Sequence, residues 1–556
     1  MPHYALGIDF GTESARALLV DVADGRELAS AVHPYRYGVI DRQLPQSAVR
    51  LGHDWALQDP QDYLEAVKQT VPAVLAVSGV APSEVIGLGI DFTSCTMLPT
   101  KSDGTPLCQL AEFRHQPHAW VKLWKHHAAQ PQADRINAVA AERDEPWLRY
   151  YGGKISSEWF FSKALQIFAD APQLYAAADR LIEAGDWLVW QLTGRESRSS
   201  CMAGFKALWQ KGDGFPERAY FAALDPALAD IIDQKMSRRL DAPGGRAGGL
   251  SAQAAAWTGL PAGAPVAVAM IDAYAAVPAG QAVQPGDMLM ILGTSTCHMV
   301  VAEERVAIPG ICGVVEDGFL PGYFCYEAGQ NATGDILAWF VRNCVPPGYH
   351  EQAARQGISL YAHLEAEAAK QRPGEHGLLA LDWWNGVRST LMDAELSGLL
   401  VGATLATTAP EIFRALIEAT AFGTRKIIDT FADGGVPVKR LIAAGGLAEQ
   451  NKLLLQIYAD VTNRELRIVK SGQAAALGAA MLGAVAAGPA NGGYPDLFIA
   501  ADRMGGLKEK WYSTNSGHVT VYDALYQEYQ RLYTLFGQGE NEVMKRLRAL
   551  RDAPAA

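Results

Sequence analysis

Apolar residues follow two different spacings along the chain, and these predict two kinds of secondary structure. Short, almost continuous apolar runs occupy residues 85–91 and 265–272, and each ends on an aspartate. Runs of this length are typical of buried strands. Apolar residues spaced three or four apart, as on one face of a helix, recur near residues 412–419, 453–461 and 525–536. Strands that alternate with helices in this way predict an α/β protein with mixed sheets.

Two further stretches have a pattern that favours a helix. Trp120, Leu123, Trp124 and His127 share one face at helical spacing, so we expect a helix here with most of that face in the core. Residues 474–488 are weakly polar and rich in Gly and Ala. This stretch is too short to span a bilayer, and we expect a helix packed inside the protein.

One local pattern occurs twice, about half a chain apart. Phe10-Gly-Thr-Glu-Ser and Leu292-Gly-Thr-Ser-Thr each lie between two short apolar runs that favour strands. Each therefore predicts a strand, a tight Gly-Thr turn and a second strand. A repeat at this distance indicates a duplicated domain and not a short solenoid repeat.

Glycine and proline suggest where the two copies are joined. The segment 241–250 has the densest Gly/Pro content in the middle of the chain, where we expect neither helix nor strand to persist. We predict an N-terminal domain at 1–258, a C-terminal domain at 259–500 and a helical extension at 501–556. Aromatic residues in this tail have helical spacing, and they can pack on their own domain or on a partner.

Composition and charge exclude several classes of protein. Among 556 residues, 48 are basic and 60 acidic, which gives a net charge of −12, and no basic run exceeds two residues. Such a chain is a poor candidate for nucleic-acid binding. The seven cysteines are scattered and form no C-x-x-C pair, which is typical of reduced thiols. Because the first residues also lack a secretory signal, we expect a cytoplasmic protein without a membrane span.

The first Gly-Thr turn has the residues of a phosphate-binding site. Backbone N–H groups at such a turn can point at one spot, and the Thr hydroxyl adds a donor, so Gly11, Thr12 and Glu13 are candidate nucleotide contacts. Asp9, at the end of the preceding strand, is a candidate ligand for Mg²⁺, direct or through water. An ordinary hairpin is the alternative for a single turn. The second copy, Gly293-Thr294-Ser295, favours two walls of one nucleotide cleft.

A third candidate lies at 441–451, where an apolar strand leads through Gly445-Gly446 into a helix. The glycines allow a ring or phosphate to approach closely, and the helix N-terminus favours an anion. An ordinary strand-to-helix turn is the alternative. P-loop, G-x-G-x-x-G and G-x-S-x-G motifs are absent from the sequence, which disfavours P-loop enzymes, the usual dinucleotide dehydrogenases and α/β-hydrolases.

Taken together, four segments resemble the FGGY carbohydrate kinases of the actin/Hsp70/sugar-kinase superfamily. They are residues 7–21, 89–96, 293–297 and 327–335, and the resemblance extends from Gly7 to about Gly483. It implies two RNase-H-like α/β domains with an active-site cleft between them, ATP and Mg²⁺ as cofactors and a sugar as substrate. Within the family, the four segments are most similar to the ribulokinase branch.

The resemblance also assigns roles to individual residues. It places Asp272 as the base that accepts the proton of the sugar hydroxyl, for which a helix N-cap is the alternative role. Residues 271–274 are Ile-Asp-Ala-Tyr, which differs from the glycerol and xylulose kinase patterns and favours the ribulokinase branch. The sugar pocket would contain Cys95, Thr96, Trp124, Lys206 and Glu327. The alternative for Lys206 is an exposed surface lysine. The adenosine would lie near Gly445, Gly446 and Asn451.

The resulting hypothesis is ATP-dependent phosphorylation of L-ribulose on its 5-hydroxyl, a step of arabinose catabolism. A kinase for D-ribulose, xylulose or ribitol is the alternative within the family, because epimers differ by single hydrogen bonds. An ATP-switched binding protein of the actin or Hsp70 kind is a more distant alternative. The expected partner is the small sugar, without nucleic acid or membrane, and a homodimer is left open.

Overall fold

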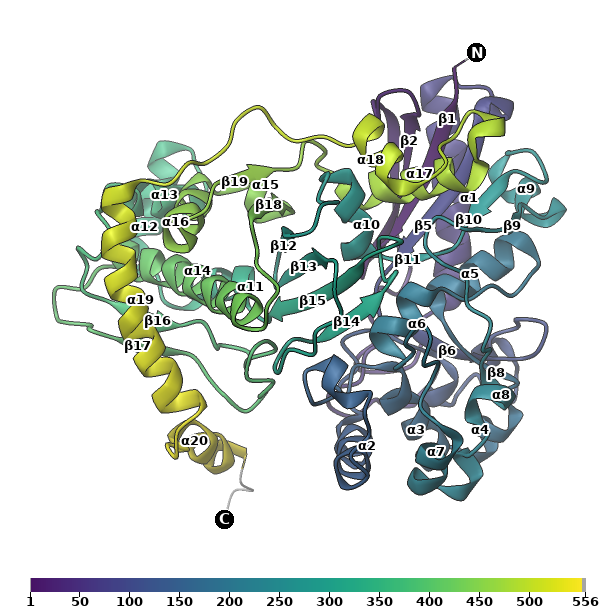
Figure 1. Cartoon of the computed structure of the whole chain (residues 1–556), viewed down its shortest axis with the longest axis horizontal. Coiled ribbons are helices and arrows are strands. Elements are labelled where there is room, and N and C mark those ends of the chain that lie inside the picture. The colour runs from purple at the N-terminus through teal and green to yellow at the C-terminus, as the bar shows by residue number, and fades with distance from the viewer. Residues whose placement is uncertain (1, 553–556) are drawn as a thin grey trace.

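The computed structural model describes residues 2–552, which form two α/β domains side by side (Figure 1). The first domain is built on a seven-stranded sheet with the order β3-β2-β1-β5-β10-β9, in which β11 also pairs with β5. Its strands are β1 (Tyr4–Phe10), β2 (Ser14–Asp21), β3 (Glu27–Pro34), β5 (Val85–Phe92), β9 (Arg246–Gly249), β10 (Pro265–Ala267) and β11 (Met270–Ile271).

The second domain is built on a six-stranded sheet with the order β14-β15-β13-β12-β18-β19. Its strands are β12 (Asp287–Leu292), β13 (Thr296–Ala302), β14 (Gly313–Glu316), β15 (Phe324–Gln330), β18 (Arg440–Ala444) and β19 (Leu466–Ile468). Both sheets start with antiparallel strands, three in the first sheet and four in the second, and the first strand of each then pairs in parallel with a later one. The predicted duplication is therefore confirmed in the topology.

The remaining strands of the described residues form two small sheets. One consists of β4 (Leu57–Gln58), β6 (Met97–Thr100), β7 (Val121–Lys122) and β8 (Arg180–Glu183), and the other of β16 (Leu379–Leu381) and β17 (Leu399–Val401).

The helices surround the two sheets. In the first half of the chain they are α1 (Pro60–Ser78), α2 (Gln130–Glu142), α3 (Phe160–Asp170), α4 (Pro172–Ala177), α5 (Ala184–Thr193), α6 (Ser200–Lys206), α7 (Arg218–Leu224), α8 (Ile231–Lys235), α9 (Ala252–Thr258) and α10 (Asp272–Ala279). In the second half they are α11 (Thr333–Asn343), α12 (Pro347–Gln356), α13 (Leu360–Ala368), α14 (Ala409–Asp433), α15 (Gly446–Gln450), α16 (Lys452–Thr462), α17 (Ala474–Ala487), α18 (Leu497–Met504), α19 (Ser516–Gly537) and α20 (Val543–Asp552).

The helix α17 crosses from the second half of the chain to the first sheet. It packs on β5, β1 and α10, and Figure 1 shows it with α18 beside β1 and β2. Glycines in the strands make this close approach possible, since a Cβ at Gly89 would lie 1.8 Å from the carbonyl oxygen of Ala479. The prediction of a buried helix at 474–488 is confirmed, and this helix completes the core of the first domain.

The C-terminal extension packs on its own chain. Helix α19 lies along the second domain (Figure 1), and its tyrosines 522, 526, 529 and 533 belong to the core of that domain. The hydroxyl of Tyr529, for example, donates a 2.9 Å hydrogen bond to Asp382, next to β16.

The sheets divide the chain differently from the ranges that we expected. The first sheet extends past residue 258 to Ile271, and α17 packs on it although it lies within 259–500. The expectation that no strand persists at 241–250 was wrong, because β9 pairs with β10 at the sheet edge. The glycines there serve close packing: a Cβ at Gly249 would lie 3.0 Å from Gly263.

The expected helix across Trp120 to His127 was also wrong. The backbone forms a short 3₁₀ turn at Pro117–Ala119 and then β7, which pairs with β4 and β6. Trp120 and Leu123 are buried as the pattern indicated, whereas Trp124 is half-buried and His127 is exposed. The backbone hydrogen bonds go to neighbouring strands and loops. The N–H of Leu123, for example, donates to the carbonyl of Ala56 at 2.9 Å.

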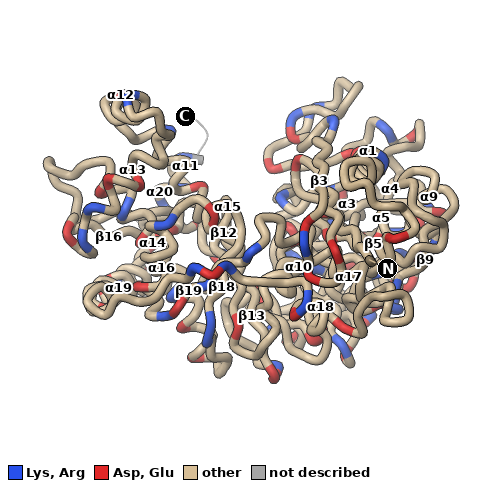
Figure 2. Tube along the Cα trace, turned by 90° about the horizontal axis from the view of Figure 1, so that it is seen from above, with Lys and Arg blue, Asp and Glu red and all other residues tan. Residues whose placement is uncertain are grey.

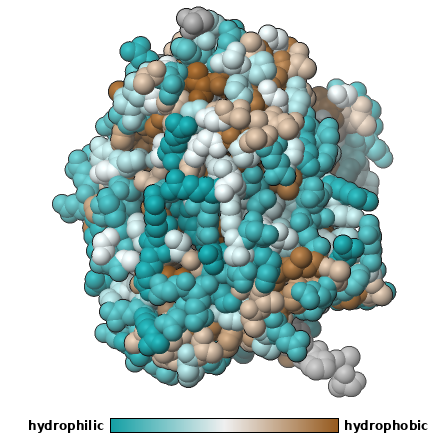
Figure 3. All heavy atoms as spheres, turned by 90° about the vertical axis from the view of Figure 1, so that its right-hand side faces the viewer, coloured by the Kyte–Doolittle hydropathy of each residue, from teal (hydrophilic) through white to brown (hydrophobic). Residues whose placement is uncertain are grey.

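Charged residues of both signs are distributed over both domains (Figure 2). The side of the first domain shown in Figure 3 is mainly hydrophilic, with smaller hydrophobic areas among the polar side chains. Among residues 2–552, no helix combines the length and the apolar character needed to span a bilayer.

Candidate active site

A cavity of about 450 Å³ lies where the two domains meet, and both domains contribute to its lining. Many of the residues expected at the site lie in this lining: Asp9, Gly11, Thr12, Trp124, Asp272, Gly293, Thr294, Ser295, Glu327 and Gly445. The fold thus gathers in one place residues from opposite ends of the sequence.

The two Gly-Thr turns are closed in a similar way, although the first is one residue longer than the second. The N–H of Gly11 donates to the carbonyl of Ser14 at 3.0 Å, and the N–H of Gly293 donates to the carbonyl of Ser295 at 3.0 Å. These two amides are therefore engaged inside their own turns, and only the amides that follow can face a phosphate. The second turn is also fixed to the start of α11, whose first amides donate to the Gly293 and Thr294 carbonyls.

Gly445 stands at the end of β18, next to the second turn. Its φ of 95° is a conformation that favours glycine, and a Cβ there would lie 2.6 Å from the carbonyl oxygen of Leu292. Gly446 begins α15, and a Cβ there would meet nothing within 4 Å. Asn451 is buried outside the lining, and its side chain caps α16 by accepting a 2.8 Å hydrogen bond from the Leu454 N–H.

Two carboxylates lie side by side at the ends of parallel strands. Asp9 on β1 is in register with Asp91 on β5. Burial raises the pKa of Asp9, and burial together with the nearby charges of Asp9 and Asp272 raises the pKa of Asp91 well above its usual range. Neither oxygen of Asp91 accepts a hydrogen bond from a donor in the described residues.

This arrangement fits a divalent cation at Asp9. Facing carboxylates repel each other when both are ionised, and oxygen ligands of this kind are the ones that Mg²⁺ prefers. Asp9 faces the cavity, whereas Asp91 is fully buried behind it. A hydrated cation at Asp9 would relieve the repulsion between the two groups.

Asp272 is the first residue of α10, directly after β11 at the edge of the same cavity. Its carboxylate accepts a 2.6 Å hydrogen bond from the N–H of Ala273, so it also helps to cap the helix. Burial raises its pKa to about 7, and the charge of Asp9 acts in the same direction. A carboxylate with this pKa is a better proton acceptor at neutral pH than an ordinary aspartate.

Glu327 on β15 binds two cations. Lys206, at the end of α6 in the first domain, lies 2.5 Å from one carboxylate oxygen, and Arg388, in the loop between β16 and β17, lies 2.7 Å from the other. Burial alone would raise the pKa of Glu327, but Lys206 and Arg388 lower it to about 2. Lys206 is 1% exposed, so it is not a surface lysine. The Lys206–Glu327 pair joins the two domains beside the cavity.

The remaining residues of the expected sugar pocket lie on two loops of the first domain. The indole N–H of Trp124 donates a 3.0 Å hydrogen bond to the Thr12 hydroxyl, which connects the pocket to the first turn. Cys95 and Thr96 are buried just behind the lining. They belong to the loop after β5, whose residues 93 and 94 do line the cavity. The Glu13 side chain is exposed and lies outside the lining.

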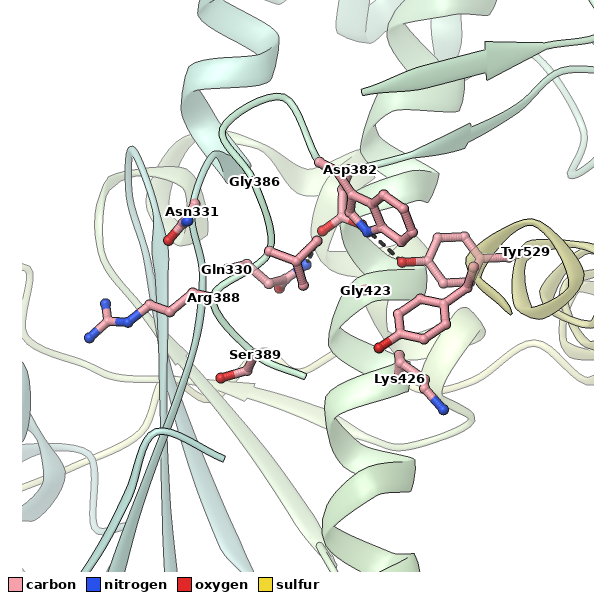
Figure 4. A pocket seen from close by; sticks show the side chains of 12 residues that line it. Gln330, Asn331, Asp382, Gly386, Arg388, Ser389, Gly423, Lys426 and Tyr529 are labelled. Atoms are coloured by element: carbon pink, nitrogen blue, oxygen red, sulfur yellow. Dashed lines mark hydrogen bonds between the residues drawn. The ribbon is translucent and has the colours of Figure 1, made fainter. Parts of the chain in front are cut away.

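Sequence reasoning missed several residues of the lining, among them Arg16, Arg388 and the segment 471–475. Arg16 lies opposite Asp9 on β2 and could have been found from the hairpin register. Arg388 lies on an irregular loop, without a local pattern to mark it. Figure 4 shows its side chain pointing away from Asp382 and Tyr529, which enclose a smaller pocket nearby. The segment 471–475 leads into α17 and contributes a helix N-terminus to the cavity.

Comparison with known proteins identifies the family of the chain. Residues 4–278 match the model of the N-terminal domain of the FGGY family of carbohydrate kinases, and residues 288–487 match that of the C-terminal domain. The chain is 53% identical to the ribulokinase of Geobacillus thermodenitrificans, over 100% of this chain and 98% of the relative. It is 52% identical to the ribulokinase of Mycolicibacterium smegmatis, over 99% and 97%.

Solved structures share the fold at low sequence identity. A xylulose kinase from Rhodospirillum rubrum has a TM-score of 0.77 at 23% identity, covering 96% of this chain and 99% of that one. A glycerol kinase from Plasmodium falciparum with ADP has a TM-score of 0.74 at 14% identity, covering 96% and 98%. The fold, the cavity and the family matches together show that the chain belongs to the FGGY family of carbohydrate kinases.

Proposed function

We propose that this protein is an ATP-dependent ribulokinase that transfers the γ-phosphoryl group of ATP to the 5-hydroxyl of L-ribulose. The relatives that are about half identical over the whole chain are ribulokinases, and this supports the substrate class. One structural observation carries the proposal: Asp272 shares a single interdomain cavity with both Gly-Thr turns and with Glu327. A phosphate donor, a proton acceptor and a polar sugar pocket therefore meet in one space.

ATP would lie mainly against the second domain. Its phosphates would lie between the two turns, where the amides after Gly11 and Gly293 are available, and the adenosine would extend past Gly445. The N-terminus of α17 at 473–475 adds a favourable field for a phosphate. Mg²⁺ held at Asp9 would neutralise charge on the phosphates.

Asp272 would act as the base. Phosphoryl transfer needs an acceptor hydroxyl held in line with the γ-phosphate and a group that takes its proton. Because Asp272 stands at the boundary of the two domains, it can contact a sugar bound on the first domain while facing the phosphates of the second. Its raised pKa brings it close to the range in which a base works at neutral pH.

The sugar would bind between Trp124 and Glu327. The ring of Trp124 offers an apolar wall, and the carboxylate of Glu327, which faces the cavity, can accept hydrogen bonds from sugar hydroxyls. Lys206 keeps Glu327 ionised and joins it to the first domain. Cys95 and Thr96 would act by shaping the loop at 93–96. Closure of the domains over the sugar would exclude water and limit futile ATP hydrolysis.

A coupled ADP-release assay across L-ribulose, D-ribulose, D-xylulose, L-xylulose and ribitol tests the proposal. We expect L-ribulose to have the highest kcat/KM, and ³¹P NMR of the product should place the phosphate on carbon 5. A higher kcat/KM for another pentulose or polyol would contradict the substrate and leave the kinase assignment intact. The oligomeric state stays a prediction, to be measured by light scattering.

A further inference from the structure

The loop after β5 has a strained backbone next to the sugar pocket. Cys95 has a φ of 54°, in the left-handed region that residues with a side chain rarely adopt. Such a conformation is unfavourable and persists only where the surroundings hold it in place. Its neighbours Thr93 and Ser94 line the cavity, so the strain lies directly behind the site.

A buried lysine provides the contact that holds this loop. Lys163, on α3, is fully buried, and its ammonium donates a 2.5 Å hydrogen bond to the carbonyl of Cys95. It donates a second hydrogen bond, of 2.7 Å, to the carbonyl of Leu123. Burying a cation is unfavourable unless its donors find acceptors, and here both acceptors are backbone carbonyls of loops beside the cavity. Burial lowers the pKa of Lys163 to about 8, which is consistent with this enclosed setting.

The two carbonyls belong to the two loops that form the first-domain side of the sugar pocket. Leu123 directly precedes Trp124, whose indole N–H donates to the Thr12 hydroxyl of the first Gly-Thr turn. The loops are almost 30 residues apart in sequence, and one ammonium spans them. Displacing either carbonyl would shift Ser94 or Trp124 in the lining.

We propose that Lys163 is a positioning residue for sugar binding, which fixes the 93–96 loop and Trp124 relative to each other without touching the substrate. The inference rests on the proposed function, since it needs the sugar to bind at these loops. Lys163 differs from a lysine that only fills the core, because its ammonium donates hydrogen bonds to backbone carbonyls of the pocket loops.

The chain contains a matched control. Lys122 on β7 is also fully buried in the first domain, but its ammonium donates to the side chain of Gln166 at 3.0 Å and lies over the ring of Trp55 at 4.3 Å. It makes neither of the two carbonyl contacts. Substitution of Lys122 removes a buried cation of the same kind and leaves the hydrogen bonds from Lys163 to both loops in place.

The experiment compares Lys163→Met with Lys122→Met by steady-state kinetics with L-ribulose and ATP. For Lys163→Met we expect the KM for the sugar to rise at least tenfold, while the KM for ATP stays within about twofold. For Lys122→Met we expect both constants to stay within about twofold, even where the melting temperature falls as much as in Lys163→Met. Equal changes in the two KM values of Lys163→Met, or an unchanged sugar KM, would overturn the proposal.

A second variant covers the case in which Lys163→Met does not fold. Lys163→Gln keeps an N–H donor on a shorter side chain, and we expect a smaller rise in the same sugar constant. If Lys163→Met does not fold and folded Lys163→Gln has an unchanged KM for the sugar, Lys163 has a purely structural role and the proposal is wrong. The wild-type panel separates the two proposals: if another sugar is the best substrate, the proposed substrate fails, and the comparison is repeated with that sugar.

Discussion

The two sheets have similar topologies, but they carry different residues at the strand ends near the cavity. In the first sheet, Asp9 lies opposite Asp91 at the ends of β1 and β5. In the second sheet, at the corresponding ends of β12 and β18, Ile291 lies opposite Ala444. All but Asp91 line the cavity. One copy of the duplicated unit thus presents the acid Asp9 to the cavity, with Asp91 buried behind it, and the other presents apolar side chains.

This difference indicates that the two sheets have different roles at the cavity. Buried acids suit a cation and a proton, whereas a small residue such as Ala444, followed by Gly445, leaves room for a nucleotide. Two similar turns would therefore serve two kinds of chemistry, because the residue two positions before the glycine is Asp9 in one copy and Ile291 in the other. Four predictions test this contrast.

The largest effect is expected from a substitution of Asp272, an acidic residue that lines the same cavity as Asp9. Asp272→Asn removes the proton acceptor and keeps the size, and general-base catalysis is worth about 10²–10⁴ in rate. We expect kcat to fall by about 10³ while the Kd for ATP stays within threefold, measured by coupled assay and calorimetry. Asp103→Asn, at an exposed carboxylate, should leave both unchanged. A residual kcat above a tenth of wild type would exclude Asp272 as the base.

Asp9→Asn tests the cation at the first copy. The substitution removes the charge that faces the cavity, so we expect kcat to fall about 10²-fold and the Mg²⁺ concentration for half-maximal rate to rise. A Mg²⁺ titration at saturating ATP and sugar measures both. Asp24→Asn, on the exposed turn after β2, is the control. If the Mg²⁺ requirement of Asp9→Asn matched the control, the cation would have to bind elsewhere.

Gly445→Ala tests the proposed nucleotide site at the end of β18, where apolar residues line the cavity. Its Cβ would meet the Leu292 carbonyl at 2.6 Å, and the left-handed conformation adds about 1–2 kcal/mol. We expect the KM for ATP to rise about tenfold, with the sugar KM little changed and the melting temperature several degrees lower. Gly446→Ala, one residue later in open space, should behave as wild type. Similar behaviour of the two variants would show that Gly445 has no special place at the nucleotide.

The smallest effect is a pH dependence. Burial and the Asp9 charge raise the pKa of Asp272 to about 7, and the base works only when ionised. The rate should therefore be highest above this pKa and fall as the pH drops through it, by about threefold between pH 7.5 and 6.5. A pH profile of kcat/KM for the sugar shows this limb, and a rate that is flat down to pH 5 would contradict it.

Much of the site could be predicted because its signals are local. A strand that ends in Asp9 and a Gly-Thr turn form from neighbouring residues, and repetition of the turn revealed the second copy. The family resemblance then connected Asp272, Lys206 and Glu327, which no local pattern joins. The Lys206–Glu327 pair crosses between domains, so its burial could be known only from the fold.

The failures have physical reasons as well. The spacing of Trp120 to His127 fits a helix, but strand pairing with β4 and β6 satisfied the backbone instead. The glycines at 244–249 suggested a linker, whereas two of them allow tight packing at the sheet edge. Arg388 and the start of α17 reach the cavity through tertiary packing, which periodicity in one segment does not encode.

The crossing of α17 has a consequence for how the chain is made. Gly7, Gly87 and Gly89 form a strip of backbone without side chains on which this helix packs, and the helix begins at residue 474. A nascent chain leaving the ribosome would present the first sheet long before its cover is translated. The first domain, although it is synthesised first, therefore cannot complete its core before residue 487 has been made, and the second domain needs the still later helix α19. Both walls of the cleft therefore depend on segments near the C-terminus, so the cleft can form only late in synthesis.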